Sequence, residues 1–93
     1  MQESDANNKK IWSEAVRDII TELRVKTGKT PYKLSAECSM AKNTWYDVES
    51  GKCKDPAFST IWKMAEAFDI LPEDLVCKIR QKLGKNFSLS DLN

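Results

Sequence analysis

The fold is decided by residues 30–51, TPYKLSAECSMAKNTWYDVESG. Thr30 offers a side-chain oxygen as an N-cap, and the proline after it occupies the first helical position, where its missing N–H costs nothing. Positions suited to burial recur at helical spacing over about 31–38 and again over roughly 42–50, and Gly51 can end the second run. We therefore expect two short helices joined by a tight turn.

The rest of the chain also has helical spacing. Apolar residues from Trp12 to Leu23 recur every three or four positions and predict a first helix of about four turns, which Gly28 ends with a left-handed cap. A fifth helix should begin at Pro72 and end at Gly84. The inner faces expected, in chain order, are Trp12, Ala15, Val16, Ile19, Ile20 and Leu23; Leu34, Ser35 and Cys38; Trp45 and Val48; Ile61, Met64, Ala65 and Phe68; and Leu75, Val76, Ile79 and Leu83. Since no alternating strand pattern appears, the expected fold is all-α with five helices.

Length and composition fit one globular domain. The 93 residues suffice for a single compact domain, and 41% apolar with 31% charged residues is typical of a folded, soluble chain. We expect a flexible N-terminal arm over 1–10, the domain over 11–84 and a C-terminal tail over 85–93. The polar N-terminus has no signal-peptide core, and no apolar run approaches a membrane span. The expected location is cytoplasmic, with no membrane contact.

Positive charge is concentrated in the segment that holds the two short helices. The whole chain has a net charge of only +1. Residues 24–54, however, hold seven basic and three acidic side chains, a balance of +4, whereas residues 1–23 come to −2 and residues 55–93 to −1. Phosphate neutralisation needs such a local patch rather than a high overall charge. A solvated helical surface with chance clustering accounts for the distribution equally well.

No group of residues indicates catalysis or a metal site. The chain has no histidine, no glycine-rich phosphate loop and no nucleophile with an identifiable base, so we expect neither an enzyme nor a cofactor. Cys38, Cys53 and Cys77 are odd in number, widely spaced and never in a CxxC pair, which disfavours zinc. We interpret them as reduced, structural cysteines.

Many of these residues belong to one ordered set along the chain. The set comprises Leu23-Arg24, Thr30, Leu34-Ser35, Met40, Lys42-Asn43-Thr44, Val48-Glu49, Gly51-Lys52, Pro56, Ile61, Met64-Ala65, Phe68 and Leu75. In order and spacing it resembles the lambda-repressor-like, Cro/C1-type helix-turn-helix family over about residues 11–83. The resemblance implies a helix-turn-helix at helices two and three, with helix three in the DNA major groove. The implied protein is a small transcriptional regulator, a repressor that binds a double-stranded DNA operator as a homodimer.

The resemblance also assigns roles to exposed positions of this helix pair. Base edges would be contacted by Lys42, Asn43, Asp47 and, beside them, Tyr46. Asparagine suits adenine, lysine suits guanine, and aspartate can accept a hydrogen bond from cytosine. Phosphates would be contacted by Tyr32, Lys33, Thr44, Lys52 and Lys54. The alternative is that the base-contacting residues are ordinary solvent-facing side chains. Asparagine and threonine are poor helix formers, however, and a surface helix without a binding role would favour alanine, glutamate or lysine.

A further implied feature is an ion pair between the first and third helices. Arg24 and Glu49 each follow an expected core residue, and the resemblance places them together as a largely buried pair with a structural role. The alternative is two unrelated surface charges. If the pair is buried, removing one partner leaves a desolvated charge and costs about 3–5 kcal/mol.

Several positions depart from the family pattern. Pro31 stands where a phosphate-binding glutamine is common, Ser39 where the turn often has glycine, and Ala41 where a capping serine or threonine is usual. These departures keep a second hypothesis open, in which the same surface binds a protein, as in an antitoxin-like or adaptor module. The fifth helix, with Phe87, Leu89 and Leu92 of the tail, is the candidate dimer contact, and the alternative for the tail is a frayed terminus.

Overall fold

The computed structural model describes residues 2–90, with side chains from residue 7 onward. Over this part of the chain the protein forms five helices and no strand, with bounds α1 Gln2–Thr27, α2 Pro31–Glu37, α3 Thr44–Ser50, α4 Phe58–Ala67 and α5 Pro72–Leu83. The expected all-α, five-helix architecture is confirmed. None of these helices is both long enough and apolar enough to cross a bilayer.

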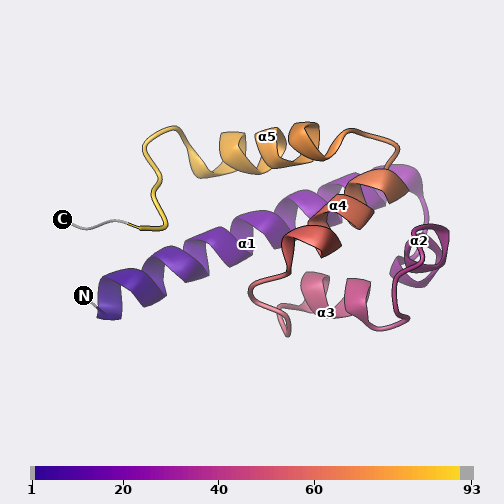
Figure 1. Ribbon diagram of the computed structural model, residues 1–93, viewed down its shortest axis with the longest axis horizontal. Coiled ribbons are helices and arrows are strands. Elements are labelled where there is room, and N and C mark those ends of the chain that lie inside the picture. Colours follow the sequence, from indigo (N-terminus) through magenta and orange to yellow (C-terminus); the bar gives the residue numbers. More distant parts are fainter. Residues whose placement is uncertain (1, 91–93) are drawn as a thin grey trace.

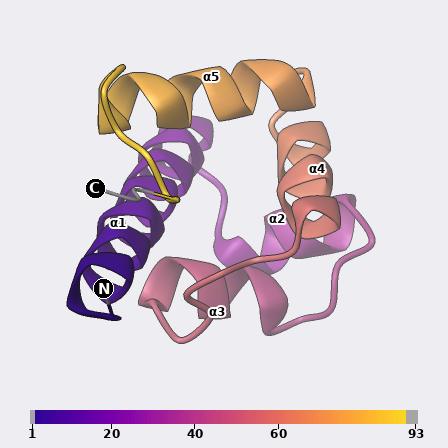
Figure 2. The same cartoon turned by 60° about the vertical axis from the view of Figure 1, so that its left-hand side comes forward.

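α1 is the long element against which the other helices assemble. α5 lies along one side of it and α3 lies on the opposite side, as two views of the ribbon show (Figure 1 and Figure 2). α2 contacts α3 and α4, and α4 in turn contacts α5. The inner side of α3 is therefore held by α1 and α2, far from α5.

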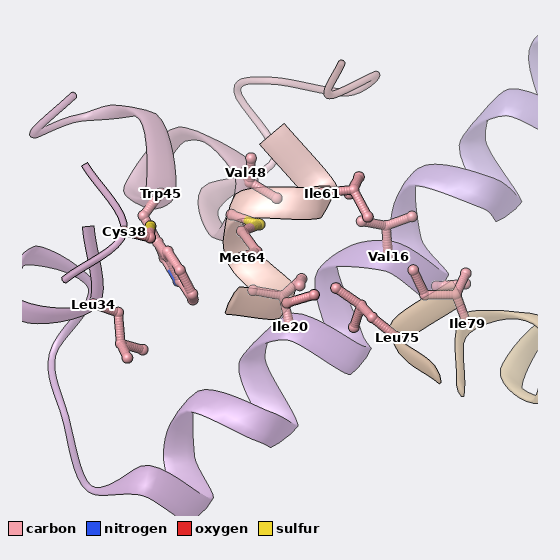
Figure 3. Packing of buried hydrophobic residues seen from close by; sticks show 12 residues of the cluster. Val16, Ile20, Leu34, Cys38, Trp45, Val48, Ile61, Met64, Leu75 and Ile79 are labelled. Atoms are coloured by element: carbon pink, nitrogen blue, oxygen red, sulfur yellow. The ribbon is translucent and has the colours of Figure 1, made fainter. Parts of the chain in front are cut away.

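The core draws apolar side chains from all five helices (Figure 3). Its buried members are Ala15, Val16, Ile20, Leu34, Cys38, Trp45, Val48, Ile61, Met64, Ala65, Leu75 and Ile79. Trp45 is fully buried, and its ring meets Phe68 edge to face, with centroids 5.2 Å apart and planes at 78°. Aromatic rings favour this arrangement because the positive edge of one meets the negative face of the other. The largest core side chain thus comes from the short helix α3.

The connection between α2 and α3 follows the capping chemistry expected from the sequence. Thr30 Oγ1 accepts a hydrogen bond from the Lys33 amide at 3.1 Å and caps α2. At the other end of α2 the chain turns through Ser39, whose φ of +55° is left-handed, and the Met40 amide donates to the Ser35 carbonyl at 2.9 Å. Gly51 then ends α3 at φ +86°. A left-handed serine is strained by about 1 kcal/mol relative to glycine, so this turn is held by its surroundings.

Two expected helix starts are wrong. α1 begins at Gln2, so the residues expected as a flexible arm are helical from residue 2 on. No glycine or proline interrupts 2–27, and extending an existing helix is far less costly than nucleating one. α3 begins at Thr44 rather than Lys42, because the Thr44 amide donates to the Ala41 carbonyl at 3.0 Å and closes a turn before the helix. Lys42 and Asn43 therefore precede α3.

Val76, which was expected in the core, is exposed instead, and so are two aromatic residues of α4. Val76 points away from the stripe formed by Leu75 and Ile79, which are four residues apart and share one face of α5. On α4, Phe58 and Trp62 lie outside the core and pack against each other edge to face, with ring centroids 6.3 Å apart. Aromatic content alone did not distinguish this surface pair from the buried Trp45.

Candidate functional site

The surface formed by α2, the turn and α3 collects most of the residues assigned a binding role. Seven of the nine are exposed: Tyr32, Lys33, Lys42, Asn43, Tyr46, Lys52 and Lys54. Thr44 and Asp47 are half-buried. The two tyrosines expose 62% and 61% of their surface, which is high for aromatic side chains. Nothing in residues 2–90 covers this surface.

The start of α2 and the turn before α3 are brought together by one aromatic contact. Lys42 Nζ lies 5.8 Å from the centroid of the Tyr32 ring, within the range of a cation–π interaction. The contact joins an expected phosphate-binding residue to an expected base-binding residue. Spacing along the sequence could not have predicted it, because the two residues belong to different elements.

The loop after α3 is fixed to the helix by backbone hydrogen bonds. The Asp47 carbonyl accepts from the Cys53 amide at 2.9 Å and from Ser50 Oγ at 3.3 Å. Lys52 and Lys54 flank Cys53 and are exposed. Their backbone is thus tied to α3, so both lysines extend from a segment with a defined position relative to the helix.

Electrostatically, this surface carries cations without acidic partners. Two ion pairs form within residues 24–54, Arg24 with Glu49 and Lys29 with Glu37, at 2.6 and 2.9 Å. Of the three acidic residues in 24–54, Glu37 and Glu49 are thus paired, and Asp47 is in neither pair. The lysines at 33, 42, 52 and 54 belong to neither pair. The segment's positive charge is therefore free for an anionic partner, which favours a binding surface over a self-neutralised helix face.

The inner side of α3 is fixed by the carboxylate of Glu49. Its Oε2 accepts from Arg24 Nε and from Trp45 Nε1, both at 2.6 Å, and its Oε1 accepts from Thr21 Oγ1 at 3.0 Å. The side chain of Glu49 is only 9% exposed, and that of Arg24 is 23% exposed. The expected ion pair is present. The sequence did not predict Thr21 and Trp45 as further hydrogen-bond donors to Glu49. Their spacing was a usable signal, because Thr21 lies three residues before Arg24 and Trp45 lies four before Glu49, and residues so spaced share a helix face.

Two further contacts brace the turn. Lys29 Nζ bridges both carboxylate oxygens of Glu37 at the end of α2, at 3.0 and 2.9 Å. From α4, Lys63 Nζ donates to the Ser39 carbonyl at 3.3 Å. The strained residue of the turn is thus held by a side chain from another helix, and the end of α2 is tied to the loop that precedes the helix.

The three cysteines differ in burial and are all free. Cys38 is buried at the end of α2, and this burial raises the pKa of its thiol, which keeps it protonated and unreactive. Cys53 is half-buried and Cys77 exposed, and all three thiols are free. Within the described residues, no three histidine, cysteine or acidic side chains gather in a way that could hold a metal ion. Comparison with protein-family models, curated proteins and solved structures found no match to this chain.

Proposed function

We propose that this protein binds a defined double-stranded DNA sequence through α3 and acts as a small transcriptional regulator, a repressor. The observation that carries the proposal is the contrast between the two sides of α3. One side is locked to α1 by Glu49, while the other presents short polar groups flanked by lysines without acidic partners. A rigidly held helix with this outer face suits the major groove, and the resemblance to lambda-repressor-like helix-turn-helix domains supports the same conclusion.

The start of α3 would read the bases. Asn43 precedes the helix, is exposed and makes no side-chain cap bond, so its amide is free to bond adenine at N6 and N7. Lys42 can donate to guanine, and Tyr46, the third residue of α3, is exposed as well. Asp47 is half-buried, and its reach toward a cytosine amine is shorter. Each good base contact contributes about 1–3 kcal/mol of discrimination.

Residues on either side of α3 would hold the DNA backbone. Tyr32 and Lys33 lie at the start of α2, and Lys52 and Lys54 follow α3, so the two groups flank the helix. Thr44 is half-buried and has less surface to offer. If each subunit neutralises about three phosphates, a dimer should show a slope of about −5 in log affinity against log salt, from roughly −0.9 per phosphate.

A homodimer would place two copies of α3 in successive major grooves of a palindromic operator. α5 lies on the side of α1 opposite to α3, so a dimer formed through α5 leaves both copies of α3 exposed (Figure 2). The exposed Val76 supplies apolar surface on α5 for such a contact. Of the tail residues expected there, Phe87 is half-buried, and Leu89 is exposed but lies beside the N-terminal half of α1 rather than on α5. Leu92, the third tail residue expected there, lies outside the described residues.

In vitro selection from a random duplex pool near physiological salt tests the proposal. A single enriched motif, bound with strong salt dependence, is the expected result. Asn43→Ala should then lose about 1–3 kcal/mol of binding free energy for that motif while melting at the wild-type temperature. Asn86→Ala, which removes another exposed asparagine, after α5, is the matched control and should bind like the wild type.

The second candidate is a protein-binding module. It is favoured by Tyr32 and Tyr46, because large exposed tyrosines are enriched at protein interfaces. Asp47 beside them would repel phosphates. Failure of the selection to enrich any motif would favour this candidate over DNA binding.

A further inference from the structure

A groove lies between the first half of α1, the loop after α3 and the tail that follows α5. Its volume is about 640 Å³, within the range of roughly 300–1,000 Å³ typical of small-molecule sites. Figure 1 and Figure 2 both show the tail running back from α5 toward the N-terminal half of α1. The tail thus forms one wall of this groove, which shares Lys54 with the proposed DNA-binding surface.

The lining of the groove combines an apolar surface with a positively charged rim. Trp12 of α1 and Leu89 of the tail face it from two sides. The basic residues that line it are Lys9, Lys10, Arg17 and Lys54, and the acidic ones are Glu14 and Asp55. Even without Lys9, the three cations Lys10, Arg17 and Lys54 outnumber the two acids, so charge complementarity favours a negatively charged occupant.

Arg17 fixes the position of the charged rim relative to α3. A methyl group added at Gly51 would lie 3.0 Å from Arg17 Nη1, so this guanidinium lies directly over the C-terminal cap of α3. Lys54 comes from the loop that Cys53 ties to α3 through its backbone hydrogen bond. Cations from two separate elements are thus held at one side of the groove, while Leu89 supplies apolar surface from a third.

We propose that this groove is a binding site for a small amphipathic anion, an aliphatic or aromatic chain that carries one carboxylate. The chain would pack on Trp12 and Leu89, and the carboxylate would lie among the cations of the rim, which include Arg17 of α1 and Lys54 of the loop. Arginine suits the carboxylate because its planar group can donate two parallel hydrogen bonds. The site requires no DNA and is independent of the proposed function.

A consequence of the site does rest on the proposed function. Lys54 lines the groove and is also assigned a phosphate contact, so a carboxylate bound to Lys54 would compete with the DNA backbone. The anion would then act as an inducer that weakens operator binding, and by linkage the operator would weaken binding of the anion by the same factor.

An NMR titration of the DNA-free protein with octanoate tests the site. Octanoate should shift the amide signals of Trp12, Gly51 and Leu89, whereas octanol and octylammonium, which share the chain but lack the negative charge, should bind at least about tenfold more weakly. Equal binding of the three compounds, or shifts confined to other parts of the molecule, would overturn the proposal.

Two variants separate the charged rim from the apolar wall. Arg17→Gln combined with Lys54→Gln should weaken octanoate binding about tenfold, while Lys78→Gln on α5 should leave it unchanged. Leu89→Ser, at an exposed position, should preserve the melting temperature and weaken octanoate and octanol alike. Unchanged octanoate affinity in either groove variant would contradict the proposal. So would a concentration-dependent dimer that shifts the same amides without octanoate and dissociates in Leu89→Ser, because the groove would then hold a second copy of the chain.

The competition with DNA is measured separately. Octanoate should raise the concentration of selected duplex needed for half-saturation in the wild type but not in the Arg17→Gln and Lys54→Gln double variant. If octanoate binds the DNA-free protein and leaves duplex affinity unchanged, the competition is wrong and the anion site stands. If no duplex can be selected while octanoate still binds, the DNA proposal fails and the site again stands.

Discussion

The two sides of α3 differ in what their residues contact. On the inner side, Trp45 and Val48 are buried, and the carboxylate of Glu49 accepts hydrogen bonds from Thr21, Arg24 and Trp45. On the outer side, Asn43 and Tyr46 are exposed. A helix of seven residues has too few internal hydrogen bonds to be stable alone, so its inner side must hold it in place.

This difference separates stability from binding within one helix. Residues of the inner side should control the free energy of unfolding, because they bury apolar area and satisfy a desolvated charge. Residues of the outer side should be replaceable at little cost to the fold, as a binding surface requires. The predictions below test that separation by comparing neighbouring positions on opposite sides of α3.

The largest effect is expected for Trp45→Ala. Removing a fully buried indole leaves a cavity beside Phe68 and deletes the hydrogen bond to Glu49, so the free energy of unfolding should fall by about 3–5 kcal/mol. Urea denaturation followed by circular dichroism measures it. Trp45→Phe, which keeps an aromatic ring in the core, should lose clearly less. Equal losses in the two variants would mean that the hydrogen bond, rather than packing, fixes α3.

The next effect is the loss of the Glu49 carboxylate. Glu49→Ala leaves Arg24 without its partner and Trp45 Nε1 without an acceptor, and should cost about 3 kcal/mol, the low end for a buried pair, because Arg24 can regain some water. Glu37→Ala is the matched control. It breaks an ion pair whose side chains are 39% and 35% exposed and should cost at most about 1 kcal/mol.

Equal melting temperatures for Glu49→Ala and the wild type would show that the inner side is held by packing alone. A high salt concentration provides a second check. Salt screens the exposed pair of Lys29 and Glu37 more than the pair at Glu49, so the cost of Glu37→Ala should shrink in high salt while that of Glu49→Ala persists.

Local chemistry made much of this arrangement predictable. Thr30 and Gly51 mark helix ends through their own side-chain and backbone properties, and the structure places caps at both. The ion pair of Arg24 and Glu49 was also expected. The start of α1 could not be predicted in this way. The residues before Trp12 are mostly polar and lack the apolar spacing that indicates a helix, but they contain no glycine or proline that would end one.

The binding surface was predictable in its members but not in its geometry. The sequence indicated Lys42 and Asn43 as residues of α3, whereas the turn closed by Ala41 places them before it. The stacking of Lys42 on Tyr32 and the support of Ser39 by Lys63 join residues from separate elements. Such contacts depend on how helices pack, which spacing within one helix does not specify.

A smaller effect of opposite sign is expected for Ser39→Gly. Ser39 adopts φ +55°, which glycine reaches without steric strain, so the variant should gain up to about 1 kcal/mol of stability. The Lys63 contact is to the backbone carbonyl and persists in the variant. Ser59→Gly in the first turn of α4 is the control and should lose about 0.5 kcal/mol, because glycine is a poor helix former. A loss in Ser39→Gly would mean that the serine side chain itself stabilises the turn.

The smallest effect on stability belongs to Tyr46→Ala, next to Trp45 in the chain and on the other side of α3. Its ring is 61% exposed, so truncation should change the free energy of unfolding by no more than about 0.5 kcal/mol, measured by the same urea titration. A loss above about 1 kcal/mol would place Tyr46 in the structural set and end the separation of the two sides. With the fold intact, a loss of duplex affinity in this variant would instead assign the exposed ring to the contact with the bound partner.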